Sequence, residues 1–151
     1  MAIISDNDRE TIQRHFEESL NGEVEIVMFT ERPSPIIIPG KQPCETCEQT
    51  QELLEEVASL SDNLTLTVHE ISTAKEEAFA LGINRVPAFV CKGASRGQVR
   101  FFGIPSGYEF SAFIADLIDV SRGTTDLADE TREFLATLTE PVNIKVFTTP
   151  T

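Results

Sequence analysis

The chain has 151 residues, enough for one ordinary domain or for one domain and part of another. Hydrophobic residues make up 40% of it and charged residues 25%, a balance typical of folded proteins that excludes a disordered chain. Twelve Lys and Arg against 25 Asp and Glu give a net charge of −13, which disfavours binding to nucleic acid or to anionic membrane surfaces.

No apolar run approaches the roughly 18 residues of a membrane-spanning helix, and residues 1–8 lack the basic stretch and apolar core of a signal peptide. Three cysteines are too few, and odd in number, for a disulfide-stapled secreted domain. We therefore expect a cytosolic protein that binds neither nucleic acid nor a membrane. In a reducing compartment, the pair Cys44-x-x-Cys47 is expected to be a redox couple or half of a zinc site.

The first predicted elements are a helix and a strand. Apolar residues recur every four positions from about Asp8 to Leu20, which predicts an amphipathic helix that Asn21-Gly22 ends. The β-branched and apolar segment Val24–Thr30 predicts a buried strand. Residues 31–43 contain four prolines, which predicts a long loop, and its Ile36–Ile38 run is unusually apolar for a solvated loop.

The next predicted elements alternate in the same way. A helix is expected from Cys44 to about Leu60, with apolar residues on one face and most of its glutamates on the other, solvated face. Alternation over Leu64–Ile71 predicts a strand. A short helix is expected over Thr73–Leu81, ending at Gly82.

The following segment is expected to close the sheet with a hairpin. Ala88–Cys91 predicts a strand that follows Val86-Pro87, residues 92–97 a turn, and residues 98–102 the return strand. Ser106–Glu109 has the spacing of a capping box and is expected to open a helix. The apolar residues of that helix recur on one face: Phe110, Phe113, Ile114, Leu117 and Ile118. The order is α-β-α-β-α-β-β-α, an α/β fold.

The last segment repeats the pattern of the first. Val142–Thr148 matches Val24–Thr30 as V-x-I-x-x-F-T, and a predicted helix ending near Leu138 precedes it. Such self-similarity suggests a duplicated unit, with chance similarity between two ordinary strands as the alternative. We therefore expect one unit over residues 1–120, a linker over 121–126, and a truncated start of a second unit, a helix plus its first strand, over 127–151.

The cysteine pair has a mechanical reason to lie at a helix start. Cys44 at the N-terminus of the predicted helix would be held as a thiolate by free backbone N–H groups and the helix dipole. Cys47 lies nearly one turn further and deeper. Cys44 is therefore the expected nucleophile and Cys47 the resolving thiol. Glu45 is expected in the first turn, where its negative charge disfavours the neighbouring Cys44 thiolate. The positive charge of Lys41 offsets this effect if the loop folds back towards Cys44.

A second signal is Val86-Pro87 at the start of a strand. An X-Pro bond is the realistic place for a cis peptide, and in this element order after a C-x-x-C we expect the cis form. It would turn the backbone of Val86 towards the cysteines and offer a strand-like edge to the extended chain of a substrate.

A zinc site formed by Cys44, Cys47 and two further ligands is the main chemical alternative. Cys91 lies four strand residues beyond Pro87, a distance of roughly 13 Å, and is therefore too far away to bind the same ion as Cys44 and Cys47. We expect it to be a small buried hydrophobic residue. His69 is expected to point outwards, and His15 to lie uninvolved on a surface helix. A redox-silent docking module that uses the Ile36–Ile38 loop is the non-enzymatic alternative.

These residues together resemble the thioredoxin superfamily. More narrowly, the chain resembles the N-terminal half of the glutaredoxin-like protein disulfide oxidoreductases of archaea and bacteria, which carry two tandem thioredoxin-fold units, each with a C-x-x-C. The matching segments are Val24–Thr30, Cys44-x-x-Cys47 with Gln49–Leu54, Val86-Pro87, Arg100–Phe110, Asp119–Gly123 and Pro141–Phe147.

The resemblance implies a thioredoxin-like fold with a central mixed β-sheet flanked by helices. It also implies thiol–disulfide exchange on protein or small-molecule disulfides, with no dissociable cofactor and no metal. The expected partners are disulfide-containing proteins and an upstream dithiol or a flavoprotein donor of the thioredoxin-reductase kind. The exposed strand edge at Val142–Thr148 also suggests a homodimer.

Three features depart from the family pattern. The proline-rich loop is larger than a thioredoxin-like unit needs. Met28 stands where thioredoxins carry a buried acid, and Pro43 where they carry tryptophan, so proton transfer to Cys47 needs another route, through water or Lys41. The resemblance places the C-x-x-C of a second unit just after Thr151.

Overall fold

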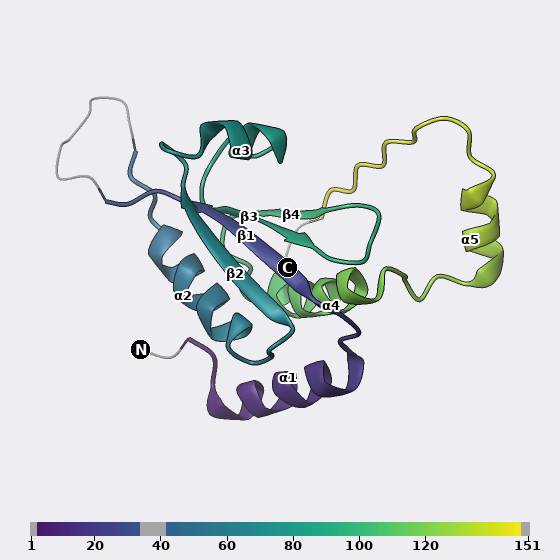
Figure 1. Cartoon of the computed structure of the whole chain (residues 1–151), viewed down its shortest axis with the longest axis horizontal. Helices are drawn as coiled ribbons and strands as arrows, with labels where there is room; N and C mark the ends of the chain where they lie inside the picture. Colours follow the sequence, from purple (N-terminus) through teal and green to yellow (C-terminus); the bar gives the residue numbers. More distant parts are fainter. Residues whose placement is uncertain (1–2, 34–41, 149–151) are drawn as a thin grey trace.

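The computed structural model describes residues 3–33 and 42–148 and contains a four-stranded sheet with helices on both faces (Figure 1). The elements in chain order are α1 (Asp6–Ser19), β1 (Val24–Thr30), α2 (Cys47–Ala58), β2 (Leu64–Glu70), α3 (Lys75–Ala80), β3 (Ala88–Lys92), β4 (Val99–Phe102), α4 (Tyr108–Arg122) and α5 (Asp129–Ala136). Up to α4 this is the predicted order. None of the helices in these two ranges is long and apolar enough to cross a membrane.

The sheet is mixed, with strand order β2-β1-β3-β4. β1 pairs in parallel with β2, and α2 makes the crossover between them. β3 runs antiparallel to β1 and forms a hairpin with β4, as the sequence predicts. The carboxyl ends of β1 and β2 therefore meet at the same edge of the sheet as the start of β3, and this edge carries the cysteine pair.

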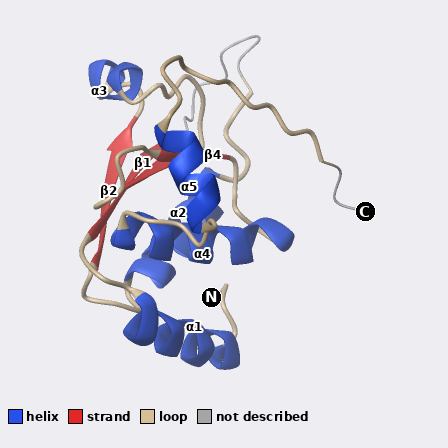
Figure 2. Ribbon diagram, turned by 90° about the vertical axis from the view of Figure 1, so that its right-hand side faces the viewer, coloured by secondary structure: helices blue, strands red, loops and turns tan. Residues whose placement is uncertain are grey.

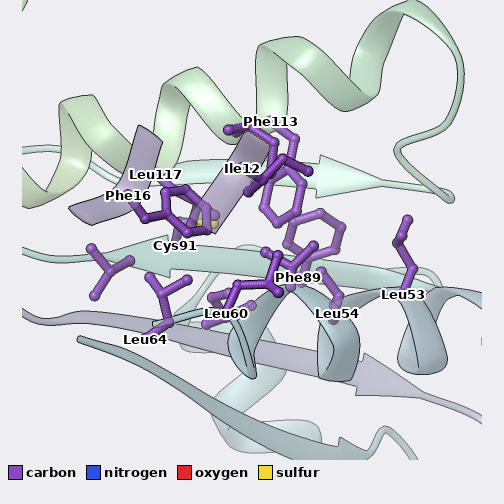
Figure 3. Close-up of a cluster of buried hydrophobic side chains, with 14 of the residues drawn as sticks. Ile12, Phe16, Leu53, Leu54, Leu60, Leu64, Phe89, Cys91, Phe113 and Leu117 are labelled. Atoms are coloured by element: carbon purple, nitrogen blue, oxygen red, sulfur yellow. The ribbon is translucent and has the colours of Figure 1, made fainter. Parts of the chain in front are cut away.

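The larger part of the core lies on the face covered by α1, α2 and α4 (Figure 2). Phe89, Phe101 and Phe113 form an aromatic cluster there, with ring centroids 4.9 to 5.5 Å apart. Figure 3 shows Phe89 and Phe113 together with Cys91, Phe16 and Leu117 in this layer. The opposite face carries a smaller cluster against α3, which includes Val27 and Phe29 from β1.

The helix starts differ from the predictions. α1 begins at Asp6 because the hydroxyl of Ser5 accepts a hydrogen bond from the Asp8 N–H and caps it. The capping box predicted at Ser106–Glu109 does not form: α4 starts after Gly107, with no side-chain hydrogen bond at the cap. Gly107 has a φ of 60°, which turns the chain into the helix at a position that favours glycine.

The expected linker begins later than predicted, because Ser121 and Arg122 belong to α4. Ser121 is buried, and its hydroxyl accepts a hydrogen bond from the N–H of Asn21, while Nε of Arg122 donates to the carbonyl of Ser19. These bonds join the end of α4 to the connection between α1 and β1. Gly123 ends α4 with a φ of 67°.

The segment after Gly123 lies on the outside of the unit. α5 confirms the predicted helix, but none of its residues is buried. Val142–Thr148, predicted as a strand, is not one: it pairs with no strand in the described ranges, and all its residues are exposed. A single extended segment cannot satisfy its backbone groups or bury its apolar side chains without a neighbouring strand.

Candidate functional site

Cys44 and Cys47 are joined by a disulfide bond at the edge of the sheet that holds the carboxyl end of β1. The S–S length is 2.05 Å and the two Cα atoms are 5.5 Å apart. Cys47 is 2% exposed and Cys44 is half-buried. The deeper position of Cys47 is the one that its spacing predicts, and Cys44 is the more exposed cysteine of the pair.

The helix behind the disulfide starts later than the sequence predicted. The N–H of Thr50 donates to the carbonyl of Thr46 as the first helical bond, and the Thr50 hydroxyl donates to the same carbonyl at 2.6 Å. Thr46 is the cap, with a non-helical φ of −115° and ψ of 6°. Cys44 and Glu45 therefore precede α2, and Glu45 does not lie in its first turn. Cys44 still lies before the N-terminus, the end at which the helix dipole is positive.

A cavity of about 400 Å³ opens beside the disulfide. It lies between the ends of β1 and β2 on one side and the start of α2 on the other. Its lining residues include Thr30, Arg32, Cys44, Cys47 and Val68, together with Gln51 and four glutamates, Glu31, Glu45, Glu48 and Glu70. Four carboxylates thus line the cavity with one guanidinium group.

Glu70 is the glutamate that the sheet itself contributes to this cavity. It is the last residue of β2 and the register partner of Thr30 in β1. Its Oε1 accepts a hydrogen bond of 3.3 Å from the backbone N–H of Arg32, and Nε of Arg32 lies 3.7 Å from its Oε2. Sequence reasoning missed Glu70. The signal was its position at the carboxyl end of the strand parallel to β1, where functional groups of α/β sheets gather.

The peptide bond between Val86 and Pro87, expected to be cis, is cis in the structure. Ala88 pairs with Phe29, so Pro87 stands level with Thr30, which lines the cavity. Pro87 is buried, and its carbonyl accepts a hydrogen bond of 2.8 Å from the N–H of Gly103. The structure thus brings Val86-Pro87 to the same sheet edge as the disulfide, although neither residue lines the cavity itself.

The prediction for His69 was wrong. Its ring stacks on Phe29 with centroids 5.5 Å apart, and Nε2 lies 3.4 Å from the carboxylate of Glu77. Its side chain is 28% exposed rather than pointing outwards, because β2 presents it to the face that α3 covers. His15 lies exposed on α1, as predicted.

Cys91 is a buried residue of the main core, as predicted. Burial, with a smaller contribution from the charge of Asp116, raises the pKa of its thiol to about 12. Among residues 3–33 and 42–148, no three His, Cys, Asp or Glu side chains are grouped so that they could hold a metal ion. Lys41 and the Ile36–Ile38 run lie outside the described residues.

A family model described as a thioredoxin domain matches residues 36–115, more than half of the chain. The chain belongs to the thioredoxin domain family. The predicted thioredoxin-like fold is thereby confirmed, and the cysteine pair, the cis proline and the cavity belong to a thioredoxin domain. No curated protein sequence gives a significant match.

Two solved structures are similar to this chain over 89% of its length. The protein disulfide oxidoreductase of Aeropyrum pernix K1 is 26% identical, with a TM-score of 0.72 over 55% of that chain. The alkylhydroperoxide reductase protein AhpF of Enterococcus faecalis V583, in a C503A mutant form, is 21% identical, with a TM-score of 0.73 over 61% of that chain, and shares the fold. The present chain therefore spans just over half the length of these proteins.

Proposed function

We propose that this thioredoxin domain is a thiol–disulfide oxidoreductase that exchanges its dithiol with disulfides of proteins or small molecules. The observation that carries the proposal is the bond between Cys44, which is half-buried, and Cys47, which is buried, beside an open cavity. The similarity to the Aeropyrum pernix protein disulfide oxidoreductase supports it.

The reaction would proceed in two exchange steps. In the reduced domain, the Cys44 thiolate attacks one sulfur of the substrate disulfide, and the other sulfur leaves as a thiolate. Cys47 then attacks the mixed disulfide at Cys44, re-forms the Cys44–Cys47 bond and releases the second substrate thiol. Two electrons pass from the dithiol to the substrate, so no dissociable cofactor is needed for the exchange itself.

Val86 and Pro87 are the proposed substrate-binding edge. Val86 is half-buried and lies two residues before β3, whose first residue pairs with Phe29 near the end of β1. An extended substrate chain could pair with the backbone of Val86 and place its disulfide over Cys44. This edge binds the main chain, so it suits substrates of differing sequence.

Glu45 and Lys41 are proposed to tune the reactivity of Cys44. Glu45 precedes α2 and lines the cavity with Cys44, so its carboxylate opposes the thiolate without being stabilised in the first turn. A Glu45→Gln variant should therefore react with iodoacetamide through Cys44 at lower pH than the wild type. Lys41 is proposed to act in the opposite direction, and a Lys41→Gln variant should require higher pH.

The electron donor is proposed to be an upstream dithiol protein or a flavoprotein of the thioredoxin-reductase kind. Each turnover leaves Cys44 and Cys47 oxidised, and only another dithiol or an equivalent reductant can restore them. The proposal also keeps the cytosolic location expected from the cysteine usage, since a reducing compartment holds such a pair ready for reaction.

Residues 127–151 are proposed to belong to a second thioredoxin-like unit of the same family architecture, with the present unit in the N-terminal position. The support is that α5 buries none of its residues and that Val142–Thr148 repeats the pattern of β1 without a partner strand in the described ranges. Deleting residues 127–151 should leave the melting temperature of the first unit within about 2 °C of its value. A larger loss would assign the segment to the first unit. The unpaired segment also keeps a homodimer among the possible partners.

The test of the function is reduction of insulin disulfides driven by dithiothreitol. The wild type should accelerate the reaction, Cys44→Ser should abolish the acceleration, and Cys91→Ser, a matched change at a buried cysteine, should retain it. Wild-type activity equal to dithiothreitol alone would favour the redox-silent docking module instead. One zinc ion per chain in the reduced protein, measured by mass spectrometry, would favour the metal site.

A further inference from the structure

We propose that the carboxylate of Glu70 accepts the proton of the Cys47 thiol when Cys47 resolves the mixed disulfide. The inference rests on the proposed function, because it assigns a proton acceptor to the second exchange step. It concerns a residue outside the C-x-x-C segment and on a different strand from the one that leads into it.

The second step needs a proton acceptor because a thiol must become a thiolate before it attacks a disulfide. Cys47 is 2% exposed, so bulk water has little access to its sulfur. Burial also favours the neutral thiol over the thiolate. A base that reaches Cys47 from within the protein would remove both obstacles.

Strand geometry directs Glu70 to the correct side of the sheet. Leu64 and Leu66 of β2 pack in the core cluster that contains the residues of α2, and side chains two apart on a strand share a face. Glu70 continues this series, while His69 points to the opposite face against Phe29. The carboxylate of Glu70 therefore faces α2, the helix that begins with Cys47, and both residues line the same cavity.

The two carboxylate oxygens have different surroundings. Oε1 is fixed by the hydrogen bond from the backbone N–H of Arg32. Oε2 is buried and receives no hydrogen bond from any described residue; it forms an ion pair with Nε of Arg32 at 3.7 Å, a separation beyond hydrogen-bond length. A buried carboxylate oxygen that lacks a donor costs free energy, and a thiol S–H is a donor that could satisfy it.

Two of the three other glutamates that line the cavity, Glu45 and Glu48, are exposed, so their carboxylates are solvated. The third, Glu31, is half-buried but follows the last residue of β1, so the strand alternation that orients Glu70 does not apply to it. In the core, β1 offers Met28, which carries no titratable group. Glu70 combines the shared cavity, a buried oxygen without a donor and a fixed orientation.

Atoms and electrons balance in the proposed step. The Cys47 sulfur bonds to the Cys44 sulfur, the bond between Cys44 and the substrate sulfur breaks, and the substrate leaves as a thiolate. The proton of Cys47 moves to Oε2 of Glu70. It then passes to solvent or to the departing thiolate, which restores the carboxylate for the next turnover.

The test separates the two exchange steps. Reduced protein is mixed with 5,5′-dithiobis(2-nitrobenzoate), and the release of the first and second coloured thiolates is followed by stopped flow over a range of pH. Glu70→Gln should leave the first phase, the attack by Cys44, unchanged. The second phase should slow by at least about tenfold at pH 7 and should rise with hydroxide concentration.

Glu48→Gln is the matched control, because it removes the same charge from the same cavity and should change neither phase beyond about twofold. Glu70→Asp keeps a carboxylate and should keep the pH profile of the wild type at a lower rate. This variant also serves if Glu70→Gln does not fold. The inference is wrong if Glu70→Gln matches Glu48→Gln, or if both phases slow equally. A wild type without a second phase would instead overturn the proposed function.

Discussion

The guanidinium of Arg9 in α1 lies 3.0 Å from the carboxylate of Glu56 in α2. The same carboxylate accepts hydrogen bonds from the backbone N–H groups of Ile3, at 2.6 Å, and Ile4, at 3.1 Å. Burial by itself raises the pKa of Glu56, but these hydrogen bonds and the charge of Arg9 bring the pKa below its ordinary value of 4.5. One side chain of α2 thus holds both the N-terminal segment and α1.

Replacing Glu56 with Gln should lower the free energy of unfolding at pH 7 by about 2 kcal/mol, because charged hydrogen bonds to three donors are lost or weakened. The folded-state pKa is depressed, so the contribution is fully present above the unfolded value and disappears as the pH falls through the folded one. Urea titrations of the two proteins should therefore differ at pH 7 and converge as the pH falls well below 4.5. Glu52→Gln, an exposed position on the same helix, should change little at either pH.

Gly123 ends α4 at a φ of 67°, and a Cβ at this position would lie 2.8 Å from the carbonyl oxygen of Ala94. Gly123→Ala should lower the free energy of unfolding by at least about 1 kcal/mol, since both the backbone angle and the close approach oppose a side chain. Gly97→Ala is the matched control: nothing lies within 4 Å of its Cβ position. It should stay within about 0.5 kcal/mol of the wild type in the same denaturation assay.

Two phenylalanines offer a paired test of the core. Phe113 is fully buried against Phe89 and Phe101, whereas Phe134 in α5 is 65% exposed. Phe113→Ala should cost about 3–5 kcal/mol in chemical denaturation, and Phe134→Ala should cost less than about 0.5 kcal/mol. A similar cost for both would mean that α5 packs on the first unit in solution.

The three cysteines should differ sharply in reactivity. Burial raises the pKa of the Cys91 thiol to about 12, so the thiol stays protonated at pH 7. The oxidised native protein should therefore show no thiol that reacts with a chromogenic disulfide reagent, and one after unfolding in urea. After reduction of the disulfide, iodoacetamide should alkylate Cys44 before the other two cysteines, and peptide mass spectrometry measures this order. Fast labelling of Cys91 in the native oxidised protein would contradict its buried position.

The fold was predictable because local patterns and packing agree. Val24–Thr30 is a strand in the prediction and in the structure. The helix face predicted to be apolar in α4 is the buried one, and it carries Phe113, Ile114, Leu117 and Ile118. The Cys44–Cys47 bond and the cis bond before Pro87 agree with what the C-x-x-C motif and the order of the elements predicted. The start of α2 was predicted wrongly. The spacing of apolar side chains suggested a start at Cys44, but Thr46 has non-helical backbone angles and α2 begins after it.

Glu70 and His69 show why part of the site escaped prediction. They are neighbours on β2 and point to opposite faces of the sheet. Glu70 lines the cavity and His69 stacks on Phe29, an outcome that depends on the pairing with β1 and on the positions of α2 and α3. Val142–Thr148 shows the converse: its sequence suits a strand, but no partner strand lies beside it in the described chain. Strand formation depends on neighbours that a single segment does not encode.

The hydrogen bonds that join Ser121 and Arg122 to the connection between α1 and β1 lie at the amino end of β1, whereas the disulfide lies beyond its carboxyl end. The seven residues of β1 separate these two places by roughly 20 Å. The residues after Gly123 therefore leave the thioredoxin domain at the end of the sheet opposite the disulfide. Any load carried by the residues after Gly123 is thus attached a full strand length away from the sulfur that a substrate would meet.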